Sequence, residues 1–123
     1  MVLLCAPLSA HEPDRMASFQ GIASPQESLA RFREWFRTAY AKELRLYKKR
    51  IGNPEPELKD AIVQFYIDTL GRPHFLGSKP EELSGPQVEI LKTTFNRSPA
   101  WTPAVQKGRK VKIKYVLPVE HRL

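Results

Sequence analysis

The sequence predicts an α+β domain: a three-stranded antiparallel sheet with two helices packed on one of its faces. Two stretches place apolar residues at steps of three and four, which is typical of amphipathic helices. Three shorter stretches alternate apolar and polar residues with period two, which is typical of half-buried strands. Their order along the chain is helix, strand, strand, helix, strand, a pattern that favours a sheet covered on one side.

Length and composition indicate one packed domain. The chain has 123 residues, of which 41% are hydrophobic, with six Phe, four Tyr and two Trp. We expect the domain to occupy residues 24–123 and residues 1–23 to be a signal-like or disordered lead-in. The apolar run 2–10 is far shorter than the roughly 20 residues of a membrane span, and Leu8-Ser9-Ala10 suits a secretory cleavage site. A floppy N-terminus of a cytosolic protein is the alternative, and lipid attachment at Cys5 is disfavoured by Leu4.

The first helix has a clear start signal. Ser24 suits the N-cap, Pro25 the first helical position, and Glu27 completes a capping box, while Gly52 ends the pattern. Its opposite face is basic, which also allows a membrane surface or an acidic partner, but we expect its apolar stripe to cover the sheet. That stripe consists of Leu29, Phe32, Phe36, Tyr40, Leu44, Tyr47 and Ile51.

A hairpin and a second helix follow. Ala61, Val63, Phe65 and Ile67 alternate with polar and apolar neighbours, and Asp68-Thr69-Leu70-Gly71 then turns the chain toward a short partner strand at His74-Phe75-Leu76. Ser84 or Gly85 with Pro86 starts the second helix, and Pro99 ends it.

The last strand is predicted to lie at an edge of the sheet. In residues 111–119, one face carries Val111, Ile113, Tyr115, Leu117 and Val119; the other carries Lys112, Lys114, Val116, Pro118 and the following Glu120. Pro118 has no N–H for a ladder, and the lysines discourage indiscriminate pairing. Such an edge can accept an extended peptide as an added strand.

The same residues resemble a known family. Trp101-Thr102-Pro103-Ala104, Gly108-Arg109-Lys110-Val111 and the final Tyr115-Val116-Leu117-Pro118-Val119-Glu120-His121-Arg122-Leu123 are similar to the end of the TonB C-terminal domain family. The resemblance is specific over about the last sixty residues. Its structural positions here are Trp101, Pro103, Gly108, Val111, Tyr115, Leu117 and Val119. For Trp101, packing in the core is favoured over an exposed anchor for a partner.

The resemblance implies a periplasmic energy-transducer module without enzymatic activity. Such a module binds the TonB box of an outer-membrane TonB-dependent receptor by strand addition, in energy-coupled transmembrane and protein transport. Only about 23 residues precede the first helix, so contact with an inner-membrane ExbB/ExbD-type complex would require an anchor supplied elsewhere. The residues expected to line the binding edge are Arg109, Lys110, Lys112, Lys114, Val116 and Pro118.

Two alternatives use the same surface differently. A stand-alone structural domain would pair two such edges in a homodimer. A net charge of +7, with Tyr66 and the Lys-rich strand, suits single-stranded nucleic acid, but Tyr115 is predicted inward and no nucleic-acid partner is expected.

No pattern of catalytic, cofactor-binding or metal-binding residues is found in the sequence. His11, His74 and His121 lie far apart and match no metal motif, and the single Cys5 has no base near it in sequence. The acidic pairs Glu55/Glu57 and Glu81/Glu82 fall in polar loops without the burial that acid–base chemistry requires. We therefore expect no cofactor.

Overall fold

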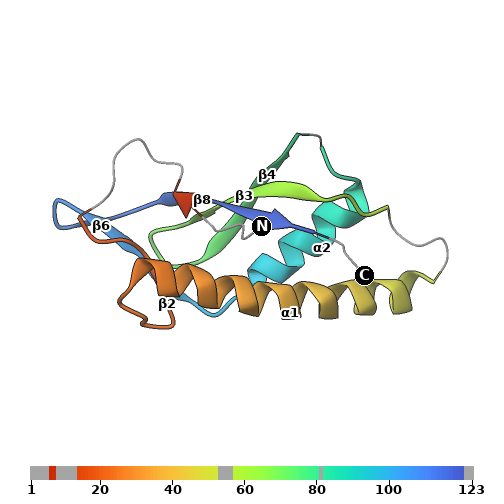
Figure 1. The fold of residues 1–123 in the computed structure, drawn as a ribbon, viewed down its shortest axis with the longest axis horizontal. Helices are drawn as coiled ribbons and strands as arrows, with labels where there is room; N and C mark the ends of the chain where they lie inside the picture. Colours follow the sequence, from red (N-terminus) through yellow and green to blue (C-terminus); the bar gives the residue numbers. More distant parts are fainter. Residues whose placement is uncertain (1–5, 8–13, 53–56, 81, 121–123) are drawn as a thin grey trace.

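The computed structural model describes residues 6–7, 14–52, 57–80 and 82–120. It has the expected α+β class: two helices lie on the same side of an antiparallel sheet (Figure 1). The three long strands lie in the order β8-β3-β4, and a two-residue strand, β1, adds to β8. The elements of this layer are α1 (Pro25–Ile51), α2 (Gly85–Asn96), β1 (Ala6–Pro7), β3 (Ala61–Ile67), β4 (Pro73–Lys79) and β8 (Ile113–Val119).

Two small two-stranded sheets accompany the main one. They are β2 (Ser18–Phe19) with β5 (Trp101–Thr102), and β6 (Ala104–Gln106) with β7 (Arg109–Val111). None of the helices in the described ranges is long and apolar enough to cross a membrane.

The helix boundaries follow the predicted caps. The Ser24 hydroxyl accepts a hydrogen bond from the Glu27 N–H at 3.3 Å, and α1 ends at Gly52, whose φ of 80° favours glycine. Ser84 caps α2 in the same way, accepting from the Gln87 N–H at 3.3 Å. These local signals are therefore sufficient to define both helices.

The core is built from one face of the sheet and an aromatic cluster beneath it. The inward residues of β3 and β8 are at most 9% exposed. Phe32 of α1 is fully buried, and its ring lies 5.4 Å from that of Phe65 and 5.1 Å from that of Trp101, centroid to centroid. Trp101 is 3% exposed and is part of this cluster, as the structural interpretation expects.

The boundary expected at residue 24 is wrong for the described residues. Ala17 and Phe19 are 2% and 1% exposed, and the Phe19 N–H donates to the buried Ser28 hydroxyl at 3.0 Å. Because β2 pairs with β5, Phe19 enters the core beside Trp101 although its neighbours show no periodicity. Residues 1–5 and 8–13, with the suggested cleavage site, Cys5 and His11, lie outside the described residues, as do Glu55, Glu81 and His121.

Two strands differ in extent from their predictions. The stretch expected to be one strand over residues 111–119 is interrupted at Lys112, which lies between β7 and β8. The partner strand expected at residues 74–76 extends over Pro73–Lys79, with an irregularity between Gln64 and Phe65 of β3 that accommodates an extra residue. The break at Lys112 separates a strand that pairs with β6 from one that pairs with β3, and the length of β4 follows the register of its hairpin with β3.

Candidate functional site

The side of β8 that faces away from β3 is the candidate binding surface of the sheet. On its other side, β8 pairs along its whole length with β3, from Val119 opposite Ala61 to Ile113 opposite Ile67. On this side, the described residues supply only β1, with Ala6 opposite Val116 and Pro7 opposite Tyr115 in antiparallel orientation. Most of this edge is therefore unmatched by any described strand.

Proline chemistry indicates which backbone groups face that edge. Pro118 lies opposite Ile62 of β3 and has no N–H, so it suits a position whose backbone groups point away from β3. Because these directions alternate along a strand, Val116 and Lys114 share its orientation and present their N–H and C=O groups to the edge. Pro7 lies opposite Tyr115, whose backbone groups point toward β3 and not toward β1. Pairing at this position therefore requires no N–H from Pro7.

The structure divides the predicted binding residues between two elements. Lys114, Val116 and Pro118 alternate on the outer face of β8, and Lys112 directly precedes that strand. Arg109 and Lys110 lie instead on β7, opposite Gln106 and Val105, across a turn in which Lys107 and Gly108 have φ of 51° and 74°.

The outer face of the sheet carries a polar row that the sequence did not reveal. The Tyr66 ring stacks on the His74 ring at 4.8 Å, and the Lys112 ammonium lies 5.2 Å from the centre of the Tyr66 ring. The His74 ring in turn contacts the Asp68 carboxylate at 2.7 Å. The alternation of residues 61–67 is enough to predict that Tyr66 points outward. The position of His74 beside it depends on the register of the hairpin, which the alternation does not give.

Asp68 stabilises the hairpin turn between β3 and β4. Its carboxylate accepts hydrogen bonds from the N–H groups of Leu70 and Arg72, each at 2.8 Å. Partial burial by itself would raise the pKa of Asp68, but hydrogen bonds from Arg72, His74 and Leu70 outweigh it and lower the pKa below its usual value of 3.8. The turn is thus held by an ionised carboxylate.

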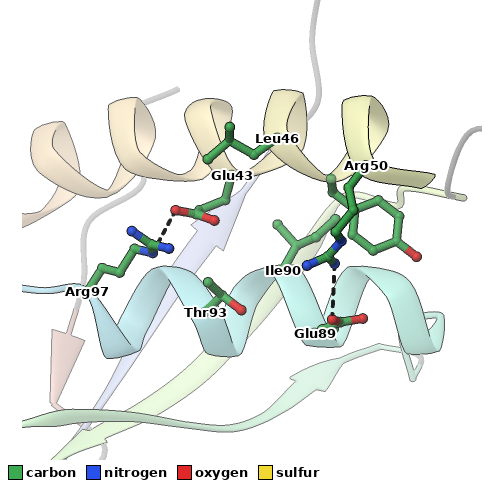
Figure 2. A pocket seen from close by; sticks show the side chains of 8 residues that line it. Glu43, Leu46, Arg50, Glu89, Ile90, Thr93 and Arg97 are labelled. Atoms are coloured by element: carbon green, nitrogen blue, oxygen red, sulfur yellow. Dashed lines mark hydrogen bonds and ion pairs between the residues drawn. The ribbon is translucent and has the colours of Figure 1, made fainter. Parts of the chain in front are cut away.

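A groove between the two helices is a second candidate (Figure 2). It encloses about 310 Å³ and is bridged by two ion pairs, Glu43–Arg97 at 2.9 Å and Arg50–Glu89 at 3.3 Å. Because both arginines are already paired with carboxylates, the described residues that line the groove offer no unpaired cation to an anionic ligand. Its remaining lining residues are Leu46, Tyr47, Ile90 and Thr93.

A buried polar cluster around Gln87, near the start of α2, has a structural role. The Gln87 amide both donates to the Lys59 carbonyl at 2.8 Å and accepts from the Lys59 N–H at 2.9 Å, and it donates to the Tyr40 hydroxyl at 3.4 Å. Burial raises the pKa of Tyr40 to about 12, only partly offset by the hydrogen bond from Gln87. These bonds attach the segment entering β3 to both helices.

Within the described ranges, no three His, Cys, Asp or Glu side chains are placed to hold a metal ion.

No family model, curated protein or solved structure matches the chain. The edge of β8 therefore has to be interpreted from its own chemistry.

Proposed function

We propose that this chain is a protein-binding module that captures an extended peptide by strand addition at the edge of β8. The observation that carries the proposal is the antiparallel pairing of β1 with Val116 and Tyr115. A segment more than one hundred residues away in sequence already uses this edge as a template. Strand addition requires what this edge offers, namely backbone donors and acceptors in a regular row with alternate side chains for register.

The partner that the family resemblance suggests is the TonB box of an outer-membrane TonB-dependent receptor. The module would then work in the periplasm, in energy-coupled transport with an inner-membrane ExbB/ExbD-type complex. The TonB-like order of its elements, α-β-β-α-β for the long ones, is consistent with this assignment. Lys114, Val116 and Pro118 would border the added strand, and Lys112 would lie beside its end.

The test is an NMR titration of the ¹⁵N-labelled full chain with a synthetic TonB-box peptide. We expect amide shifts concentrated in β8, Ile113–Val119, because an added strand changes the hydrogen bonding of that edge. A folded spectrum without shifts in β8 at a large excess of this peptide would exclude the TonB box as the ligand of this edge.

A matched pair of variants separates strand addition from surface adhesion. Val116→Pro removes an N–H that faces the edge. The substitution should be compatible with the fold because β8 already contains a proline two positions later, at Pro118, with the same backbone orientation. Val116→Thr keeps the N–H and the β-branched shape. We expect Val116→Pro to weaken peptide binding by roughly tenfold, as the loss of one backbone hydrogen bond implies, and Val116→Thr to leave it nearly unchanged.

Pairing of two β8 edges in a homodimer is the second use of this surface. Its distinguishing observation is a dimer that forms with rising protein concentration and that the peptide dissociates. Binding of nucleic acid is less well supported, since the outward Tyr66 ring already stacks on His74 and has the Lys112 ammonium over it.

A further inference from the structure

We infer that the β8 edge selects an extended peptide in which an apolar residue is followed, on the same face, by acidic residues, bound antiparallel to β8. The inference rests on the proposed function and specifies the ligand of the same site. It is carried by the register of β1 together with the distribution of charge along the edge.

The register of β1 gives the direction and the spacing. Ala6 lies opposite Val116 and Pro7 opposite Tyr115, so the position number in an added strand rises as the β8 number falls. A ligand residue in the place of Ala6 therefore faces Val116, and the residue two positions later faces Lys114. Because strand side chains alternate, both of these ligand residues lie on the outer face of the sheet.

The charge along the outer face differs between the two ends of β8. Lys114 is exposed in the strand, and Lys112 is exposed just before it, on the same face as Tyr66. None of the ion pairs found among the described residues involves either lysine, and the Lys112 ammonium lies over the Tyr66 ring of β3. Val116 and Pro118 are half-buried and apolar, and the exposed Glu120 follows the strand at its far end.

The N-terminal half of an antiparallel ligand would therefore lie beside apolar side chains of β8, and its C-terminal half beside lysines. Its N-terminal half lies against the apolar side chains of Pro118 and Val116. Its C-terminal half lies against Lys114 and Lys112, where Asp or Glu at alternate positions complements the charge. A parallel ligand of the same sequence would place its carboxylates beside the apolar Val116 and Pro118 instead.

The experiment compares three synthetic peptides on the full chain by the same amide titration. Thr-Val-Thr-Glu-Thr-Glu-Thr carries the predicted pattern, Thr-Val-Thr-Gln-Thr-Gln-Thr removes only the charge, and Thr-Val-Thr-Lys-Thr-Lys-Thr reverses it. We expect the Glu peptide to bind roughly twofold to tenfold more tightly than the Gln peptide, as expected for two exposed ion pairs, and the Lys peptide to bind most weakly. The preference should shrink at 1 M salt.

Charge variants locate the preference. The double variant Lys112→Gln and Lys114→Gln should bind the Glu and Gln peptides equally, while Lys92→Gln, an exposed lysine on α2, should keep the preference despite losing a charge. A spin label on the N-terminus of the Glu peptide should broaden amides near Val119, and a C-terminal label those near Ile113.

The outcomes distinguish this inference from the proposed function. Equal binding of the Glu and Gln peptides with shifts in β8, or labels that report a parallel strand, would overturn the inference and leave strand addition standing. If none of the three peptides nor the TonB-box peptide shifts β8, the proposed function is overturned and this inference with it.

Discussion

The inner and outer sides of β8 have opposite environments although their residues alternate along one strand. The inner side chains of Ile113, Tyr115, Leu117 and Val119 are at most 5% exposed and belong to the core. The outer side chains of Lys114, Val116 and Pro118 are exposed or half-buried and border an edge matched only by β1 among described strands. Alternate residues of β8 therefore contribute to the stability of the core or border the proposed binding edge. Substitutions on the two faces should accordingly affect different properties, unfolding free energy on the inner face and peptide binding on the outer face.

The largest effect is expected on the inner side. Tyr115→Ala removes a ring that is 1% exposed and lies 5.5 Å from the Phe65 ring and 5.9 Å from the Trp101 ring. The cavity left behind should lower the free energy of unfolding by about 3–5 kcal/mol. Urea denaturation followed by tryptophan fluorescence measures it.

Lys114→Ala, on the neighbouring outer position, is the matched control for Tyr115→Ala. Because its side chain is exposed, its unfolding free energy should stay within about 0.5 kcal/mol of the parent protein. Equal losses in the two variants would contradict the separation of the two sides of β8.

A smaller but specific loss is expected where the hairpin turn approaches the core. Gly71 has φ of 84°, and a Cβ added there would lie 1.9 Å from the Trp101 carbonyl oxygen, while Gly71 also accepts the Trp101 N–H at 2.8 Å. Gly71→Ala should therefore cost about 2 kcal/mol or more, from backbone strain and displacement of β5. Gly108→Ala, at φ of 74° in an open turn, supplies the control for strain alone.

In thermal denaturation, Gly71→Ala should lower Tm by more than Gly108→Ala does. Similar Tm values for these two variants would show that the contact with Trp101 adds nothing to the strain.

The smallest effect concerns the outer polar row and depends on pH. Because the folded-state pKa of Asp68 lies below the usual 3.8, its carboxylate contributes stability that is complete above that value and is lost as pH falls through the folded-state pKa. Asp68→Asn keeps an acceptor for Leu70 and Arg72 but does not titrate. Urea unfolding from pH 7 to pH 2 should therefore show a steeper acid loss for the parent protein than for Asp68→Asn, and parallel curves would count against the lowered pKa.

Local signals determined the elements of this fold. Ser24 and Ser84 define the helix starts because capping involves only residues three positions apart, and the alternation of residues 61–67 and 113–119 defines the inner faces because side-chain direction follows the backbone period. Pro118 favoured an edge position for the same reason, since its missing N–H is a property of one residue, but β1 pairs with part of β8 on the side away from β3.

Only the tertiary structure decided which elements meet. The burial of Phe19, the pairing of β1 with β8, the break at Lys112 and the stack of Tyr66 on His74 all join residues that are not neighbours in a local pattern. Glu43 is buried and paired with Arg97 of another segment, although nothing in the sequence of α1 distinguishes it from the other charged residues of that helix. Such contacts depend on the free energy of packing and pairing across the whole chain, which neither composition nor periodicity contains.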